Sequence, residues 1–466
     1  MPLPFTLEVF VTFVFCVLCV QSKRYEPNWD SLDSRPLPSW YDEGKIGIFI
    51  HWGVFSVPSF NSEWFWWQWK GSAPRKQVVD FMKKNYPPDW TYADFAKEFN
   101  PPAGIYNPMH WAEIFNASGA RYIVHVTKHH EGFTSWPSKH SFNWNSMDVG
   151  PGRDLVGDLA KAVRQFPNLR YGIYHSLFEW FNPLYLNDVK NNFTTTDFVS
   201  GKTLPELYEL VNTYHPDVVW SDGSKGPDTY WNSTQFLAWL YNDSPVKDFV
   251  VTNDRWGNGI ACHHGGFLTC HDRYNPGVLQ KRKFENAMTL DTRSWGYRRD
   301  MKLKQILSIE EVLETLVITI SCNGNILINV GPTKDGTIDP VFEERLRQLG
   351  SWLGVTGEAV YGSRPWTYQN DTHNSDVWYT MKSMETDSKS EMSVYAFLLK
   401  WPDSDILKLG APQASSSTVV TLLGYSGQLD YDYSPGYGLV IQIPPIPFNK
   451  MPCEWVWVFK LTNIAN

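Results

Sequence analysis

The sequence predicts an irregular (β/α)8 barrel of the TIM-like type followed by a C-terminal antiparallel β-sandwich. Three observations predict this fold class. Eight short and mostly apolar segments lie between residues 46 and 330, helical patterns separate several of them, and after Gly357 the chain changes to short alternating runs. Parallel strands that are covered on both faces are nearly continuous in apolar residues, and strands that alternate with helices form parallel sheets.

The first 22 residues are predicted to be a signal peptide. Phe10 to Val20 is apolar except for Thr12, a run too short to cross a bilayer, and small residues such as Ser22 supply a plausible cleavage site. The usual positive charge is missing, and Glu8 stands in its place. No later stretch reaches the length of a membrane-spanning helix, so we expect no membrane span.

The barrel is predicted to occupy residues 23–356 and to carry the active site. Its eight strand candidates are 46–51, 121–127, 170–176, 217–222, 249–254, 266–272, 285–291 and 325–330. Apolar residues at helical spacing predict a helix over 309–320, and Asp154 is the predicted N-cap of another. The first two strand candidates are about 70 residues apart and no clear helix precedes the seventh, which makes the barrel irregular.

Residues 357–466 are predicted to form the sandwich. Alternating runs such as MSVYAFLL and GLVIQI are separated there by polar turns that contain Gly and Pro, and none of them has a helical period. Such spacing is typical of short antiparallel strands.

Composition excludes several classes of protein. With 42% hydrophobic residues the chain is an ordinary globular protein, and a formal charge of −8 gives it no basic surface for nucleic acid. Aromatic residues reach 16%, including 23 Trp, which exceeds what a core needs and weakly favours a carbohydrate ligand, because sugar rings stack on aromatic faces.

Further features indicate passage through a secretory pathway, and we expect a secreted or lysosomal glycoprotein. Five Asn-x-Ser/Thr sequons occur, at Asn116, Asn192, Asn232, Asn242 and Asn370. Four cysteines follow the predicted signal peptide and allow three pairings: Cys262, Cys270, Cys322 and Cys453. Their spacing fits no zinc site.

Polar residues end most of the predicted barrel strands, where barrel enzymes carry their catalytic groups. The ends hold His51, the run Lys128-His129-His130-Glu131, His175, Asp222 after Trp220, the run Asn253-Asp254-Arg255, and Asp272. A purely structural barrel would not place His, Asp and Trp at nearly every such end. Adjacent histidines point to opposite faces of a strand and no HExxH spacing is present, so we expect no metal.

These segments resemble the motifs of the retaining α-L-fucosidase family, most closely its animal lysosomal and plasma type. The motifs are GIFIHWG (47–53), TKHHEGF (127–133), WSDG (220–223), NDRWG (253–257), HDRYNPG (271–277), SWGY (294–297) and NGNILINVGP (323–332). The resemblance runs in register from about residue 24 to 355. It implies a hydrolase without a cofactor that removes terminal α-linked L-fucose from glycoproteins or glycolipids, and a homotetramer.

The resemblance implies a double displacement in which one carboxylate attacks the anomeric carbon and a second carboxyl serves as acid and then as base. It places the nucleophile at Asp222. The local sequence agrees, because Asp222 ends an apolar strand beside Trp220 and is followed by Gly223, which leaves the carboxylate approachable.

Two residues compete for the acid/base role, Asp272 in HDRYN and Glu285 in KFEN. Glu285 resembles part of a family signature, but as the first residue of a strand it would lie at the wrong end of the barrel, whereas Asp272 ends a strand. Against Asp272, the neighbouring Arg273 favours the charged carboxylate, whereas a general acid must carry a proton, an objection that an acidic compartment relaxes. We favour Asp272. The family signature has Cys where this chain has Ala287, a change that we expect to leave activity intact.

The same resemblance implies a set of substrate-binding residues. They are His51, Glu63, Trp64, His129, His130, His175, Trp220 and Arg273. Histidines would bind the sugar hydroxyls, and aromatic side chains would contact the ring and the methyl group of a 6-deoxy sugar. The alternatives are a catalytically silent, lectin-like fucose-binding protein on the same scaffold, and a hydrolase of another deoxy sugar or of galactose.

Overall fold

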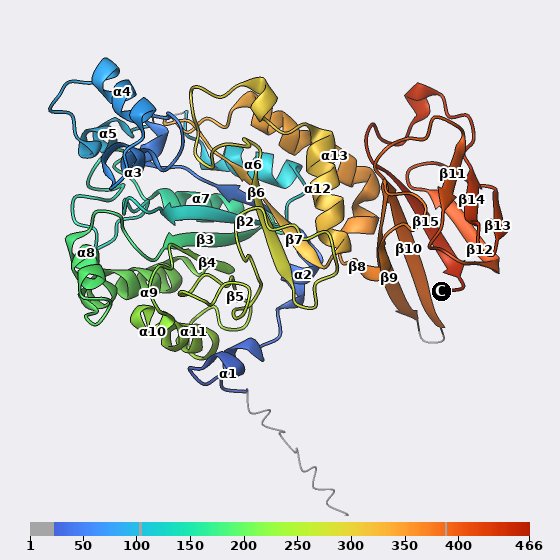
Figure 1. Ribbon diagram of the computed structural model, residues 1–466, viewed down its shortest axis with the longest axis horizontal. Helices are drawn as coiled ribbons and strands as arrows, with labels where there is room; N and C mark the ends of the chain where they lie inside the picture. Colours follow the sequence, from blue (N-terminus) through green and yellow to red (C-terminus); the bar gives the residue numbers. More distant parts are fainter. Residues whose placement is uncertain (1–22, 102–104, 387–388) are drawn as a thin grey trace, which may run out of the picture.

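The computed structural model describes residues 23–101, 105–386 and 389–466. The predicted signal peptide lies outside the described residues. A large N-terminal part is built around a parallel sheet, and a smaller C-terminal part is made of antiparallel strands (Figure 1). Within the described ranges, no helix has the length and apolar character needed to cross a membrane.

The parallel sheet has the strand order β5-β4-β3-β2-β1-β7-β6. Its strands are β1 (Ile46–Ile50), β2 (Tyr122–Lys128), β3 (Arg170–Ser176), β4 (Val218–Asp222), β5 (Val251–Thr252), β6 (Phe284–Thr289) and β7 (Gly324–Val330). Every neighbouring pair is parallel. Seven of the eight strand candidates therefore correspond to strands, although the candidate at 249–254 contains only the two-residue strand β5.

The eighth candidate, 266–272, does not form a regular strand, but it closes the ring. The backbone N–H of Phe267 donates to the carbonyl of Thr252 in β5 at 3.0 Å, and Leu268 donates to Lys283 at 2.9 Å. Leu268 and Phe284 form a single parallel bridge to β6. The chain then turns at Cys270, whose φ of 51° is left-handed and ends any extended run. The expectation of an irregular barrel is confirmed, while that of a seven-residue strand here was wrong.

Helices surround the sheet. The α-helices are α1 (Trp29–Asp33), α2 (Ser39–Gly44), α3 (Phe65–Lys70), α4 (Lys76–Asn85), α5 (Tyr92–Glu98), α6 (Pro108–Ala117), α7 (Leu155–Val163), α8 (Pro183–Lys190), α9 (Leu204–Tyr214), α10 (Asp228–Trp231), α11 (Ser233–Asn242), α12 (Ile309–Ser321) and α13 (Pro340–Val360). Short turns of helix are η1 (Val54–Ser56), η2 (Val199–Thr203), η3 (Leu303–Gln305) and η4 (Phe448–Lys450). Helices α3 to α6 fill the long interval between β1 and β2. The predicted cap is present, since the side chain of Asp154 accepts from the backbone of Gly157.

Alternate residues of each strand enter different cores. Phe49, Tyr122, Tyr174 and Trp220 pack together inside the barrel. Their neighbours in sequence, such as Ile173, face the surrounding helices and join a separate cluster. Because side chains alternate along a strand, only one of two consecutive residues can point into the barrel. Each large apolar side chain buried in this way contributes about 1.5–3 kcal/mol.

The C-terminal part consists of two antiparallel sheets, as predicted. The first has the order β12-β15-β10-β9-β8, and the second β11-β14-β13. The strands are β8 (Arg364–Asn370), β9 (Val377–Thr386), β10 (Lys389–Leu398), β11 (Ile406–Leu409), β12 (Ala414–Leu422), β13 (Tyr431–Ser434), β14 (Gly438–Gln442) and β15 (Trp457–Ile464). Leu407, Ile441 and Phe459 belong to one apolar core that joins the two sheets.

Candidate active site

A pocket of about 280 Å³ lies at the carboxyl ends of the barrel strands. Eight of the eleven residues predicted to act in catalysis or substrate binding line it: His51, Glu63, Trp64, His129, His130, Trp220, Asp222 and Asp272. Its wall also contains residues to which the sequence analysis assigned no role, among them Phe49, Tyr174, Arg255 and Trp295. The volume suits a ligand of one ring, with an aromatic wall and a few convergent polar groups.

Asp222 ends β4, and two side chains donate hydrogen bonds to its carboxylate. The hydroxyl of Tyr174 donates to Oδ2 at 2.9 Å, and Nη1 of Arg255 donates to Oδ1 at 3.1 Å. Nε2 of His130 lies 3.6 Å from Oδ2. Burial alone would raise the pKa of Asp222, but the Arg255 charge and the Tyr174 hydrogen bond keep this pKa well below its ordinary value. The side chain, 24% exposed, is therefore an ionised carboxylate that a ligand can reach.

Arg255 connects the two candidate catalytic carboxylates. Its Nη2 donates to Oδ1 of Asp272 at 2.8 Å, while Nη1 binds Asp222. The guanidinium lies over the ring of Trp220, 4.7 Å from its centroid. Burial works against the charge of Arg255, but the two carboxylates outweigh burial and raise its pKa. One cation thus places both acidic groups at the same pocket.

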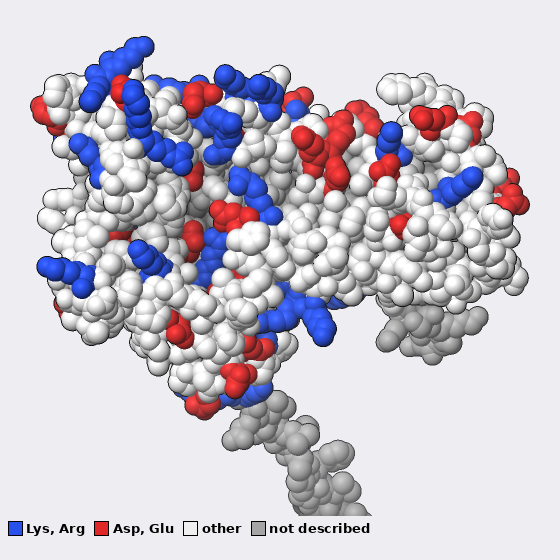
Figure 2. Space-filling model, viewed as in Figure 1, with Lys and Arg blue, Asp and Glu red and all other residues white. Residues whose placement is uncertain are grey.

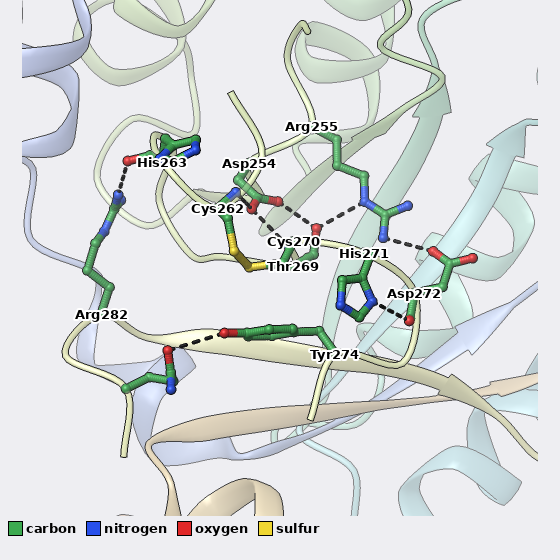
Figure 3. The surroundings of a disulfide bond; sticks show 11 residues. Asp254, Arg255, Cys262, His263, Thr269, Cys270, His271, Asp272, Tyr274 and Arg282 are labelled. Atoms are coloured by element: carbon green, nitrogen blue, oxygen red, sulfur yellow. Dashed lines mark hydrogen bonds and ion pairs between the residues drawn. A yellow bond between two sulfur atoms is a disulfide. The ribbon is translucent and has the colours of Figure 1, made fainter. Parts of the chain in front are cut away.

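The loop that carries Asp272 is braced by a disulfide between Cys262 and Cys270 (Figure 3). Oδ2 of Asp254 accepts from the backbone N–H of both cysteines, at 2.8 and 3.0 Å. Thr269 donates to the other oxygen of Asp254 and accepts from Nε of Arg255. The disulfide, Asp254 and Arg255 therefore fix the position of Asp272 together.

Glu285 lies inside the barrel but does not line the pocket. Its carboxyl group accepts from the hydroxyls of Tyr41 and Tyr122, at 2.8 and 2.6 Å, and from the indole N–H of Trp220 at 2.9 Å. Burial raises the pKa of Glu285, and these hydrogen bonds oppose the shift without cancelling it. The position near the start of β6 agrees with the sequence argument, since Trp220 stands between Glu285 and the pocket.

Two of the pocket histidines are held through one ring nitrogen each. Nδ1 of His51 lies 2.7 Å from Oδ1 of Asn329, and Nδ1 of His130 lies 2.6 Å from Oγ of Ser176. Because Ser176 donates its own proton to a carbonyl, His130 must be the donor in that pair. Burial lowers the pKa of His51 to about 3 and that of His130 well below its ordinary value, so both rings are neutral. Each keeps Nε2 as an acceptor for a ligand hydroxyl.

The remaining predicted pocket residues have clear partners. Nδ1 of His129 lies 3.1 Å from Oε2 of Glu131. Oε2 of Glu63 accepts from the backbone N–H of Trp295 at 2.9 Å, which ties the segment after β6 to the start of α3. Trp64 is 37% exposed at the mouth of the pocket.

The structure corrects the prediction for His175. In β3 the side chain of Tyr174 enters the barrel, so the next residue must face outward. Nε2 of His175 lies 3.0 Å from Oε2 of Glu206 in a buried cluster that also contains Lys128 and Lys202. The alternation in RYGIYHS shows that Tyr174 and His175 face opposite sides of the strand, but not which of the two faces inward.

Arg273 is also placed differently from the prediction. Its exposed guanidinium stacks on Trp295 and donates to the carbonyl of Thr292 at 3.3 Å, in a neighbouring cavity. The arginine that binds Asp222 is Arg255, which reasoning from the sequence placed at a strand end but assigned no role. A cation that directly follows the buried Asn253-Asp254 pair at the barrel mouth was the available signal.

Other predicted positions lie away from the pocket. Ala287 is buried among the barrel core residues. Asn116 and Asn192 are exposed, whereas Asn232, Asn242 and Asn370 are partly buried. Cys322 and Cys453 are free thiols. Within the described part of the chain, no group of three or more His, Cys, Asp or Glu side chains is arranged to hold a metal ion.

Comparison with known proteins gives a consistent picture. A family model described as alpha-L-fucosidase matches residues 12–358, and a model of the alpha-L-fucosidase C-terminal domain matches residues 369–462. The chain is 58% identical to an alpha-L-fucosidase of Branchiostoma floridae over 95% of this chain and 96% of that protein. It is 54% identical to the tissue alpha-L-fucosidase of Homo sapiens over 95% and 92% of the two chains.

Solved structures are similar as well. The crystal structure of the Thermotoga maritima alpha-fucosidase in complex with fucose aligns with a TM-score of 0.76 at 30% identity, and covers 94% of this chain and 100% of that one.

Proposed function

The chain belongs to the α-L-fucosidase family, and we propose that Asp222 is the nucleophile and Asp272 the acid/base of its reaction. It is a retaining glycoside hydrolase that acts on α-linked L-fucose. The observation that carries the assignment of roles is the single guanidinium of Arg255, which binds both carboxylates at the wall of one monosaccharide-sized pocket. Retaining enzymes need two carboxyl groups close together on a bound sugar.

In the first step, an oxygen of Asp222 forms a bond to the anomeric carbon as the bond to the glycosidic oxygen breaks. Arg255 and Tyr174 keep Asp222 ionised and orient its lone pairs. Asp272 gives its proton to the departing oxygen, so that an alcohol leaves. The side chain of Asp272 is 47% exposed and is held by Arg255 alone among its described ion-pair partners, so it can turn toward that oxygen and exchange protons with solvent.

In the second step, Asp272 acts as base. It takes a proton from a water molecule, the water oxygen attacks the anomeric carbon, and the bond to Asp222 breaks. Two inversions give net retention, and both carboxyl groups return to their starting states.

The pocket wall matches the two kinds of surface on L-fucose. Neutral His51 and His130 offer acceptors to hydroxyl groups, and Phe49 and Trp220 offer apolar faces to the ring and to the methyl group. Among the described residues nothing favours a catalytically silent fucose-binding protein, since every group that the chemistry needs is present.

We further propose that the substrates are fucosylated glycoproteins or glycolipids and that the protein is secreted or lysosomal. The predicted signal peptide and the five sequons support this proposal. Asn116 and Asn192 are the most accessible glycan acceptors, because their side chains are exposed. The side chain of Asn242, by contrast, is hydrogen-bonded to both backbone groups of Tyr25. The tetramer implied by the family resemblance stays a prediction.

The proposed roles can be tested with p-nitrophenyl α-L-fucoside. The wild type should release nitrophenol and fucose, and NMR recorded before mutarotation should show the fucose in the retained, α configuration. Asp222→Ala abolishes release, and azide restores it by taking the place of the carboxylate, which yields a fucosyl azide of inverted configuration. Normal turnover by folded Asp222→Ala would exclude Asp222 as the nucleophile.

A further inference from the structure

A larger cavity lies beside the pocket that we assign to fucose. Its volume is about 810 Å³, and Glu63, Trp64 and Trp295 line both spaces. The smaller pocket accommodates one ring, so the rest of a fucosylated glycan must lie outside it. The departing oxygen must be next to the acid/base, and Arg273, which directly follows Asp272, lines the larger cavity. This cavity is therefore on the leaving-group side.

The wall of the cavity is unusually cationic. Four arginines line it: Arg75, Arg273, Arg293 and Arg298. Arg298 is buried and neutralised by Asp291 through bonds of 2.6 and 2.8 Å. The other three are exposed, and no carboxylate of the described chain lies within ion-pairing distance of their guanidinium groups.

Two carboxylates at the cavity, Asp300 and Glu63, offset part of this charge but lie outside ion-pairing distance of the three exposed arginines. Asp300 is 3.8 Å from Arg298, and Glu63 is engaged with Trp295 and Ser294. The chain as a whole carries a formal charge of −8, so the three unpaired arginines at this cavity contrast with the net charge of the protein. Figure 2 shows Lys and Arg side chains gathered over the region of α4, whereas Asp and Glu side chains gather over the region of α12 and α13.

We propose that this cavity binds the leaving-group glycan, and that Arg75, Arg273 and Arg293 make it prefer glycans that carry carboxylate or sulfate groups. A guanidinium donates two parallel hydrogen bonds to either group, which gives geometric selection as well as charge attraction. Trp64, exposed on the shared wall, offers an aromatic face to the sugar next to fucose. The proposal rests on the proposed function of the central pocket.

The test compares matched fucosides on one enzyme. The substrates are a neutral fucosylated trisaccharide and two derivatives of it, one carrying a sialic acid and one a sulfate on the leaving-group sugars. We expect kcat/KM to be about tenfold higher for an anionic derivative than for the neutral one at low ionic strength. Salt at about 0.5 M should reduce this ratio toward one, because exposed charges are then screened. A preference for only one derivative would identify which anion the cavity accepts.

The variant Arg75→Gln/Arg293→Gln should reduce the ratio to about one to two, since two of the three guanidinium groups are gone. The control is Lys83→Gln/Lys84→Gln, which loses the same charge at the other end of α4, outside the cavity, and should keep the wild-type ratio. Equal kcat/KM for all three wild-type substrates, or an unchanged ratio in the arginine variant, would overturn the proposal. Release from p-nitrophenyl α-L-fucoside is measured alongside, and its absence in the wild type would instead refute the proposed function.

Discussion

Nη1 of Arg255 lies 3.1 Å from Oδ1 of Asp222, and this contact sets the charge state of the proposed nucleophile. Asp222 ends β4, whereas Arg255 lies in the loop that follows β5, and the two residues are 33 positions apart in the chain. Burial opposes ionisation of Asp222, and the guanidinium reverses that effect. The contact therefore belongs to the chemistry of the site as well as to its architecture.

Replacement of Arg255 by Met should lower kcat/KM about 10²–10³-fold, which is typical for loss of a preorganised charge at a reacting centre. Asp222 must be ionised to attack, and without Arg255 its pKa rises. The acid limb of the kcat/KM profile should therefore move to higher pH. Arg255→Lys keeps the charge and should show a smaller shift of that limb. An unmoved acid limb in folded Arg255→Met would contradict this account.

Asp272→Asn and Glu285→Gln distinguish the two acid/base candidates. In Asp272→Asn, kcat/KM should fall about 10²–10⁴-fold on a natural oligosaccharide, because its leaving group needs a proton. On a dinitrophenyl fucoside, whose leaving group needs no proton, kcat/KM should fall much less. Glu285 only accepts hydrogen bonds from Tyr41, Tyr122 and Trp220, and Glu285→Gln keeps the shape of its side chain. Any loss of kcat/KM in this variant should therefore be the same for good and poor leaving groups. If the leaving-group dependence occurred in Glu285→Gln instead, the two roles would have to be exchanged.

Loss of the Cys262–Cys270 disulfide should affect catalysis as well as stability. The Cys262→Ser/Cys270→Ser variant frees a short loop, and its free energy of unfolding should be about 2–3 kcal/mol lower. Because this loop holds Asp272, kcat/KM should fall more on poor leaving groups than on good ones. The matched control is Cys322→Ser, which removes a free thiol from outside the pocket. Equal losses on both kinds of leaving group would show that the disulfide does not position Asp272.

Glu206→Gln should destabilise the fold by about 3–5 kcal/mol, because a buried carboxylate is removed from two buried lysines. Oε2 of Glu206 accepts from Lys128 at 2.8 Å, and Oε1 accepts from Lys202 at 2.7 Å. Chemical denaturation measures the loss. The kcat of the protein that remains folded should stay near the wild-type value, since Glu206 lies outside the barrel. A stable but inactive variant would assign this cluster a role in the reaction.

His125 makes stability depend on pH. It is buried in β2 beside Tyr171, and burial lowers its pKa to about 3, against about 6.5 in an unfolded chain. Between these values the unfolded state binds a proton that the folded state excludes, so stability falls as the pH is lowered from about 6.5 toward 3, by about 1.4 kcal/mol per pH unit. His125→Gln should remove this part of the slope. Midpoints of urea unfolding at pH 7 and pH 5 measure it, and an unchanged difference between them would contradict the prediction.

The sequence by itself determined the parts of this protein that depend on short-range patterns. Apolar runs with intervening helical periods predicted seven strands of the barrel, and alternating runs predicted the antiparallel C-terminal part. Strand ends located most of the pocket, because the carboxyl ends of parallel strands share one face. Trp220 and Asp222 were found in this way, because both stand at the carboxyl end of one predicted strand.

Only the tertiary structure decided which side chains meet. It placed His175 outside the barrel and Tyr174 inside, because a side chain's face depends on where its strand begins within the sheet. It put Arg255 between Asp222 and Asp272. It also placed Arg273 at the neighbouring cavity, not in the pocket where it was predicted, and it paired Cys262 with Cys270. Most of these contacts link loops that follow different strands, and no local pattern encodes the direction in which such loops fold back over the barrel.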